Sequence, residues 1–360
     1  MRHESSPSAT PEFPVSFESE PTVTTDVSPA EWDRYVSTRA DATGYHLWRW
    51  RDVFQNALGH ECLYYAARCN GRIVGVLPTV RIRSVLFGRA LSSLPYVNYG
   101  GVLADTTDAG RALLSAISRT LQAEGLDYLV LRHRARQFAG LPARNHKVTM
   151  LLPLEPTAEA MWNALDRKVR NQVRKAEKSG VTIRTGGADL LDDFYRVFAR
   201  NMRDLGTPVY GRALFVEMLR AFPDAAHVHL AMRNDEAIAG AISYRYGTTI
   251  EVPSASSLRE HRAFCPNHLL YWEVIRSAIA AGLTTLDFGR STPNDGTYHF
   301  KEQWGARCEP LWWEYVLSAG AVVPGIDRHD SKFRLSIEAW KRLPVGIATL
   351  IGPRLARAVP

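Results

Sequence analysis

The chain has 360 residues, of which 46% are hydrophobic, 22% charged and 10% aromatic. This composition is typical of a globular protein with a large core, and it excludes collagen, coiled coil and disorder for most of the length. At this length we expect two domains rather than one. Lys and Arg number 44 against 37 Asp and Glu, which gives a formal charge of +7.

The positive charge is concentrated in two segments. Residues 166–178 hold six basic and two acidic residues, and residues 328–360 hold seven basic and two acidic residues. Their net charges of +4 and +5 leave the rest of the chain nearly neutral. This distribution argues against general coating of nucleic acid, and it predicts one or two specific anionic partners.

The cysteines and the chain ends indicate the compartment. Four cysteines are scattered without a Cys-x-x-Cys motif, and no carboxylate and histidine cluster has the spacing of a metal site. We therefore expect reduced thiols, no metal and a cytosolic protein. Residues 1–28 lack the apolar core of a signal peptide and are expected to form a disordered tail. The apolar run 343–352 has about half of the ~20 residues that a membrane-spanning helix needs.

The first expected elements are a helix and a hairpin. Pro29 stands in the first turn of a helix, with Ser28 as the expected cap. Two apolar runs, 63–68 and 73–80, flank an Asn70-Gly71 turn, and this pattern predicts a β-hairpin.

Helices and strands then follow in a similar order in both halves. The first half continues with a helix over 111–124 and a strand over 126–131. The second half is expected to contain strands at 228–232, 237–242 and 249–254, a helix at 267–281 and a strand at 283–288.

Two pieces of the halves align with each other. Residues 123–129 align with 280–286 at an offset of 157, and residues 73–76 align with 238–241 at an offset of 165. These similar offsets suggest a duplicated α/β unit with a mixed sheet in each half. The alternative is that helix–Gly–strand segments simply look alike.

A basic amphipathic helix is expected between the halves, over 157–179. Its apolar stripe comprises Met161, Leu165, Val169, Val173 and Ala176. Its other faces carry Arg167, Lys168, Arg170, Arg174, Lys175 and Lys178. Gly180 is expected to end the helix.

Five segments in order carry a family resemblance. They are LPYVNYGG (94–101), RKVRNQVRKAEKSG (167–180), MRDLGTPVY (202–210), PNHLLYW (266–272), and DFGRST (287–292) with TYHFKEQWGA (297–306). Together they resemble the FemAB-related acyltransferases, specifically the bacterial subgroup found with exosortase/PEP-CTERM systems. The resemblance covers about residues 32–317.

This resemblance implies a fold and an activity. The implied fold is α/β with mixed sheets, in two tandem GNAT-like domains (the acyl-CoA N-acyltransferase fold) over 29–155 and 156–318. A basic amphipathic tail, 319–360, would follow. The implied activity is transfer of an acyl or aminoacyl group to an amine of a peptidoglycan, envelope or exopolysaccharide precursor. Some members of the wider family take the amino acid from aminoacyl-tRNA.

Acyl transfer to an amine requires a group that stabilises the developing oxyanion. Phe300 and Trp304 are four residues apart and would face inward on a helix, which places Lys301 at the edge of that face. Phe300-Lys301 matches the family's Phe-Lys pair, whose lysine stabilises the oxyanion. The alternative is a solvated surface lysine.

Several polar residues flank the same segment. Asp287 lies in an apolar strand and is either a polar anchor or base, or the partner of an ion pair with Arg290. Arg290 and Ser291 open a loop that would bind a diphosphate or a carboxylate, unless Arg290 only braces Asp287. Tyr298 either donates a hydrogen bond to substrate or is merely buried.

Further candidates depend on the family context. Two glycines after a polar and aromatic pair allow a ligand to approach the backbone, or serve a turn: Asn98, Tyr99, Gly100 and Gly101. Asn267 is a reasonable helix cap, and His268 is then its neighbour rather than a base.

The sequence is compatible with two classes of acyl donor. Acetyl-CoA-dependent GNAT domains hold the pyrophosphate in a glycine-rich loop before a helix, but the equivalent stretch, 257–266, contains no glycine. Arg259 and Arg262 would be its only phosphate contacts. We expect no tightly bound cofactor, and either aminoacyl-tRNA or an acyl-CoA as donor.

The two basic segments have several interpretations. Arg167, Lys168, Arg170 and Arg174 would grip tRNA or a nucleotide- or lipid-linked diphosphate, bind anionic membrane, or form a solvated face. Aromatic residues do not alternate with these charges, so base stacking is not indicated. The tail either lies on the inner face of the membrane or packs on the protein itself.

The function expected from these observations is that of a cytoplasmic acyl- or aminoacyltransferase acting on an envelope precursor. One alternative is an acyl-CoA-dependent N-acyltransferase of the same fold. Another is a non-catalytic GNAT-like module that binds envelope lipids or RNA.

Overall fold

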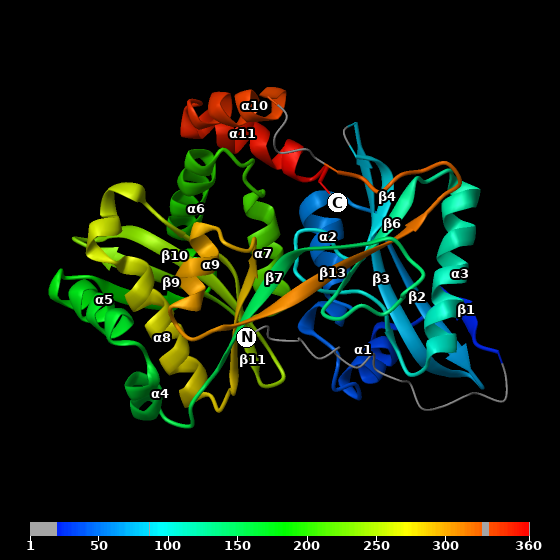
Figure 1. Cartoon of the computed structure of the whole chain (residues 1–360), viewed down its shortest axis with the longest axis horizontal. Coiled ribbons are helices and arrows are strands. Elements are labelled where there is room, and N and C mark those ends of the chain that lie inside the picture. Colours follow the sequence, from blue (N-terminus) through cyan, green and yellow to red (C-terminus); the bar gives the residue numbers. More distant parts are fainter. Residues whose placement is uncertain (1–19, 86, 326–330, 360) are drawn as a thin grey trace, which may run out of the picture.

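In the part of the chain that the structure describes, thirteen strands form one mixed sheet that runs through both halves (Figure 1). The computed structural model describes residues 20–85, 87–325 and 331–359. Along the sheet the strand order is β1-β2-β3-β4-β6-β13-β7-β12-β11-β10-β9-β8, and β5 pairs with β3. The expected mixed sheet is therefore confirmed.

The first half contains three α-helices and seven strands within its described residues. They are β1 (Thr22–Thr24), α1 (Pro29–Ser37), α2 (Trp50–Leu58), β2 (Cys62–Cys69), β3 (Arg72–Ser84), β4 (Gly88–Ser92), β5 (Leu103–Ala104), α3 (Thr107–Glu124), β6 (Tyr128–His133) and β7 (Ala143–Pro153). A 3-10 turn, η1 (Gly44–His46), precedes α2.

The second half supplies the remaining elements. They are α4 (Ala158–Ala164), α5 (Arg167–Lys178), β8 (Thr182–Gly186), η2 (Ala188–Leu190), α6 (Leu191–Leu205), α7 (Arg212–Ala221), β9 (Ala226–Arg233), β10 (Glu236–Tyr246), β11 (Thr249–Ser257), η3 (Arg259–Phe264), α8 (Pro266–Ala280), β12 (Thr285–Ser291), α9 (Gly296–Glu302) and β13 (Arg307–Leu317). Two tail helices follow, α10 (Ser331–Lys341) and α11 (Val345–Ala356).

Local signals in the sequence explain the first elements. The Ser28 side chain accepts a hydrogen bond from the backbone of Glu31 and caps α1, as expected. Asn70 and Gly71 both adopt positive φ, which matches the twist of the β2–β3 hairpin.

The expected disorder of residues 1–28 is corrected in part. Residues 1–19 lie outside the described residues. Thr22–Thr24 forms strand β1, because its backbone pairs antiparallel with the edge of β2.

The basic helix is interrupted at one point. Asp166 has an extended ψ of 143°, so α4 ends before it, and its side chain accepts from the Lys168 backbone to cap α5. The apolar stripe is buried as expected, including Leu165, Val169 and Val173.

The two halves exchange strands at the centre of the sheet. Strand β7 of the first half pairs with β12 of the second, and β13 of the second half pairs with β6 of the first. In addition, β13 pairs with β7, so the sheet is continuous across the junction. The domain boundary at residues 155 and 156 stays a prediction.

A shared hydrophobic core also connects the halves. Trp50 and Phe54 of α2 belong to the same buried cluster as Phe194 of α6 and Phe215 of α7. Helix α2 contacts α7 directly. The first half is therefore packed against the second through side chains as well as through the sheet.

The tail packs on the body of the protein. Helices α10 and α11 lie over α6 (Figure 1). Arg203 of α6 donates to the carbonyl of Leu343 at 2.9 Å, between the two tail helices. Among the described residues, none of the helices combines the length and apolar character that a membrane span requires.

Candidate active site

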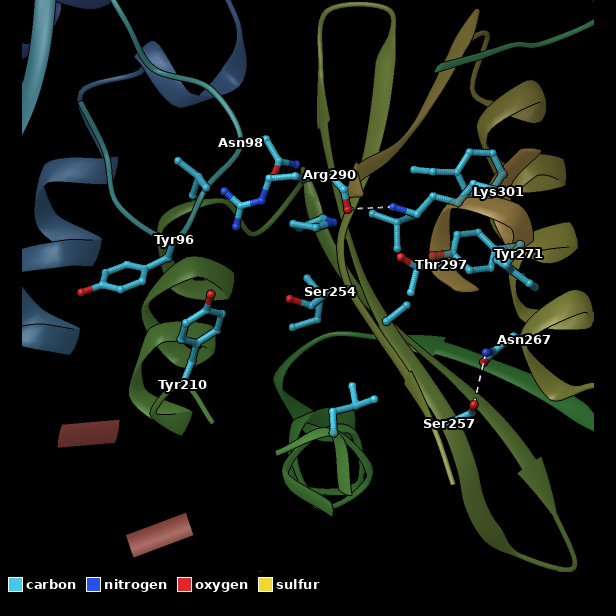
Figure 2. Close-up of a pocket in the computed structure, with 18 of the residues that line it drawn as sticks. Tyr96, Asn98, Tyr210, Ser254, Ser257, Asn267, Tyr271, Arg290, Thr297 and Lys301 are labelled. Atoms are coloured by element: carbon cyan, nitrogen blue, oxygen red, sulfur yellow. Dashed lines mark hydrogen bonds between the residues drawn. The ribbon is translucent and has the colours of Figure 1, made fainter. Parts of the chain in front are cut away.

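A cavity of about 810 Å³ lies where the two halves meet. The first half contributes α2 and the loop that contains Tyr96 and Asn98. The second half contributes α7, β11, the start of α8, and α9 with the loop before it. Figure 2 shows Lys301 and Tyr271 across the cavity from Tyr96 and Tyr210.

Strands β11 and β12 carry two carboxylates beneath this cavity. They run parallel, and their register places Glu251 directly beside Asp287. After Asp287 the pairing of β12 with β7 is irregular, and Gly289 adopts a φ of +71°. The pairing of β12 with β11 ends at Asp287, and the carbonyls of Gly289 and Arg290 face Lys301 of α9.

Asp287 is held by three donors. Its carboxylate accepts from the hydroxyls of Tyr99 at 2.5 Å and Thr149 at 2.7 Å, and from the backbone N–H of Gly289 at 2.7 Å. The alternative of an ion pair with Arg290 is not among these bonds, because the Arg290 guanidinium lies over the ring of Trp313 instead. Burial raises the pKa of Asp287, but the three donors oppose the increase and favour the ionised form.

Glu251 is a residue of the candidate site that the sequence analysis did not single out. Its Oε1 accepts from the Tyr45 hydroxyl at 2.9 Å and from Asn98 Nδ2 at 2.5 Å. Burial and the neighbouring charge of Asp287 raise the pKa of Glu251 well above its usual value. We assign the neutral acid to Glu251 and the charge to Asp287, because Asp287 has more donors. A lone carboxylate in the apolar strand 249–254 was the available signal.

Lys301 lies on α9, and its side chain is only 7% exposed. The alternative of a solvated surface lysine is therefore wrong. Its Nζ donates to the carbonyls of Gly289 at 2.8 Å and Arg290 at 3.1 Å. Burial lowers the pKa of Lys301 to about 8, although the nearby carboxylates, Asp287 first, favour its charged form. An ammonium has three protons, so one N–H is left for a ligand.

Asp295 fixes the start of α9. Its carboxylate accepts from the backbone of Thr297 at 3.0 Å and of Tyr298 at 2.9 Å. Such a cap satisfies two backbone donors that have no partner within the helix. Asp295 and Thr297 also line the cavity.

Two arginines lie close together, Arg290 in the cavity wall and Arg132 buried behind it. Arg290 lines the cavity, and its buried Nη1 has no hydrogen-bond partner. The guanidinium groups of Arg132 and Arg290 lie over the ring of Trp313, 4.9 and 5.6 Å from its centre. Burial, together with the charge of Arg290, lowers the pKa of Arg132 to about 9. A carboxylate or phosphate would compensate these charges.

The other predicted site residues fall into two groups. Asn98 lines the cavity, and Tyr99 lies beneath it on Asp287. Ser291 is buried but does not line the cavity, and neither does Tyr298.

Gly100 and Gly101 serve packing within the protein. Gly100 adopts a φ of +123° against Leu94, and a Cβ on Gly101 would lie 2.0 Å from the ring of His133. Close packing therefore accounts for this Gly-Gly pair without a ligand.

The predicted basic residues lie beside the cavity rather than in it. Arg167, Lys168 and Arg174 are exposed and Arg170 is half-buried. Helix α5 packs on α8, and Cys265 of the cavity wall donates to Gln172 of α5 at 2.5 Å.

The start of α8 differs from the expectation. Cys265, at φ +56°, occupies the cap position, and Asn267 donates to the Ser257 hydroxyl at 3.2 Å instead. His268 lines the cavity, and burial is the main cause that lowers its pKa to about 4, with the charge of Lys168 contributing.

Two segments that carried the family resemblance meet at the cavity. Tyr96 and Tyr210 line it, with ring centres 5.4 Å apart. They are far apart in the sequence, so their contact depends on the packing of the first half on α7. Ser254 and Ser257 of β11 are further lining residues that the sequence analysis did not single out.

The comparisons agree with this architecture. A family model described as "Acetyltransferase (GNAT) domain" matches residues 164–302. This match covers most of the second half of the chain. A comparison with curated protein sequences gives no match.

Solved structures extend the likeness to both halves. The crystal structure of FemX has a TM-score of 0.61 and 16% identity, covering 82% of this chain and 97% of that one. A tandem GNAT protein from the clavulanic acid biosynthesis pathway has a TM-score of 0.53 and 12% identity, covering 84% and 99%. L-PGS from Bacillus licheniformis has a TM-score of 0.51 and 10% identity, covering 89% and 98%.

These findings confirm the expected fold, a mixed α/β protein of the tandem GNAT type. The GNAT domain supports acyltransferase chemistry. The exosortase/PEP-CTERM subgroup stays a prediction.

Proposed function

We propose that the protein forms an amide by transferring an acyl or aminoacyl group to an amine of an envelope or exopolysaccharide precursor. The observation that carries this proposal is the buried Lys301 ammonium at the cavity, whose charged form Asp287 favours and which has one N–H left for a ligand. The exosortase/PEP-CTERM association belongs to the same proposal, and the family resemblance of the five sequence segments supports it.

The reaction joins the acceptor nitrogen to the carbonyl carbon of the donor. As the C–N bond forms, the carbonyl oxygen becomes an oxyanion, which the third N–H of Lys301 stabilises. The bond to the leaving oxygen or sulfur then breaks, and the leaving group takes up the proton that the amine loses. The products are one amide and one alcohol or thiol.

Asn98 is placed to orient the amine. Its Nδ2 donates to Glu251, which fixes the side-chain amide and leaves Oδ1 free to accept. An amine N–H bound to Oδ1 directs its lone pair elsewhere, toward the donor carbonyl.

Arg290, beside Arg132, supplies the site for an anionic group of the acceptor. A carboxylate or a diphosphate would accept a hydrogen bond from Arg290 Nη1, which has no hydrogen-bond partner among the described residues. A nucleotide- or lipid-linked precursor carries such groups.

The donor we favour is aminoacyl-tRNA. Residues 259–264 form η3 without glycine, which gives no support for a backbone cradle for a CoA pyrophosphate. Helix α5 packs on α8 and contacts the cavity wall through Gln172, and its exposed basic face, which carries Arg167, Lys168 and Arg174, would contact the tRNA backbone. The second candidate is an acyl-CoA, which the matching GNAT family model favours.

The test replaces the lysine while keeping its length. Lys301→Met should reduce the rate of amide formation by about 10²–10³-fold, because one oxyanion donor is lost. Thermal shifts produced by donor and acceptor should persist, which separates a transferase from a binding module. The control is Lys341→Met on α10, assayed with a soluble acceptor; this lysine donates to Glu338 and does not line the cavity. Equal rates in both variants would contradict the proposal.

A further inference from the structure

Exposed apolar side chains gather at one place on the molecule. Among the described residues, eight large apolar side chains are exposed. Five belong to the tail: Leu335, Ile347, Leu350, Leu355 and Val359. A sixth, Leu205, ends α6, on which both tail helices pack.

Helix α11 is oriented with its large side chains outward. Its inner face consists of small residues, Ala348, Gly352 and Ala356, which are buried. A Cβ on Gly352 would lie 3.0 Å from the backbone of Val209, so the helix is held close to the body. The opposite face presents Leu350, which is 67% exposed. Water-soluble helices normally show the reverse arrangement.

The tail is also strongly basic. Residues 331–359 contain six Lys and Arg and one carboxylate, Glu338. Arg342, in the turn after α10, and Arg354 of α11 are exposed near these apolar side chains. Apolar side chains interspersed with Lys and Arg are typical of segments that lie in the interface of an anionic bilayer.

This surface adjoins the wall of the cavity. Leu205 lines the cavity and is 48% exposed. Tyr96, also in the cavity wall, donates to the carbonyl of Arg357 at the end of α11, at 2.8 Å. The tail helices therefore reach from α6 toward the first half (Figure 1), and they meet the cavity wall at Leu205 and Tyr96.

We infer that the outer surface of α10 and α11, with Leu205, docks on an anionic phospholipid membrane. The surface binds the lipid interface through its leucines and isoleucine, and its arginines contact the phosphate groups. Docking brings the cavity to the bilayer surface, where a lipid-linked acceptor is presented. The functional role of this docking rests on the proposed function. Membrane binding itself does not depend on catalysis.

The test is flotation of the full chain with vesicles. The protein should bind vesicles containing phosphatidylglycerol, bind pure phosphatidylcholine weakly, and dissociate as salt is raised. Leu350→Glu should reduce binding to the anionic vesicles at least about tenfold, because a carboxylate replaces an inserted side chain. Arg342→Gln and Arg354→Gln should each reduce it about fivefold, the effect of one surface charge.

The matched control is Val322→Glu. Val322 is 79% exposed after β13, outside the tail helices, and its replacement should leave binding unchanged. Equal losses in Val322→Glu and Leu350→Glu would overturn the inference, as would a wild type that stays free of anionic vesicles at low salt. A wild-type dimer that Leu350→Glu converts to a monomer, without vesicle binding, would show a contact between copies and overturn it too.

The two proposals can fail separately. Leu350→Glu should retain amide formation on a soluble acceptor, because Leu350 does not line the cavity that contains Lys301. Loss of vesicle binding with retained catalysis in this variant supports docking. A wild type that binds vesicles but forms no amide contradicts only the proposed reaction.

Discussion

Glu251 and Asp287 lie side by side on neighbouring strands and differ in their hydrogen-bond donors. Three donors favour the ionised form of Asp287, whereas Glu251 is buried beside that charge and stays protonated. Two neighbouring buried carboxylates commonly differ in protonation in this way, one being a neutral acid and the other an anion. The anion of Asp287 in turn favours the charged form of Lys301.

This assignment predicts different effects for two conservative substitutions. Glu251→Gln replaces a neutral acid by a neutral amide, so its rate of amide formation should stay within about tenfold of the wild type. Asp287→Asn removes a charge that favours the Lys301 ammonium, so the pKa of Lys301 should fall below its present value of about 8. The decline of the rate at alkaline pH should then begin at lower pH.

Rate against pH in both variants is the measurement. Identical alkaline limbs in Asp287→Asn and the wild type would contradict the link between Asp287 and Lys301. A larger loss in Glu251→Gln than in Asp287→Asn would reverse the assignment of the proton.

At the scale of elements, α9 and the bend in β12 together position Lys301. The helix is seven residues long, and Asp295 caps it through two backbone donors. A short helix gains little from internal hydrogen bonds, so its position depends strongly on the cap.

Asp295→Ala should therefore affect both stability and catalysis. Loss of the cap should cost about 1 kcal/mol of the free energy of unfolding and lower the rate of amide formation by displacing Lys301. The control is Thr157→Ala, which removes the comparable cap of α4, where Thr157 accepts from Ala160 at 3.1 Å. That variant should lose similar stability in thermal unfolding and keep its rate. A normal rate in Asp295→Ala would show that α9 holds its place without the cap.

Most elements could be predicted from local patterns. Ser28, the Asn70-Gly71 turn and the apolar periodicity of α3 and α5 specify their elements through short-range interactions. The break at Asp166 was missed. The capping hydrogen bond that favours a new helix there contributes only about 1 kcal/mol, and the apolar periodicity continues across it.

Part of the site required the tertiary structure. Lys301 and Arg290 could be named from their motif, since both lie in the segment 287–306. Glu251 and Arg132 could not be named in this way. Glu251 depends on the strand register that places it beside Asp287, and Arg132 depends on the ring of Trp313, which it shares with Arg290. These contacts join residues on separate strands, which leave no periodic signal in the sequence.

At the scale of the whole molecule, the exchange of β7 and β13 makes the two halves one sheet. The cavity lies at their junction, lined by Asn98 from the first half and Lys301 from the second. Because α2 also packs on α7, the two sets of groups are held in fixed positions. Such preorganisation is what amide formation between two bound substrates requires.

The measurement that tests this account most directly is the rate of amide formation against pH, with the product identified by mass. The account predicts a bell-shaped profile. The rate rises as the acceptor amine loses its proton, and it falls through pH about 8, where Lys301 loses its charge. Donor and acceptor that both stabilise the protein but give no amide at any pH would contradict the account.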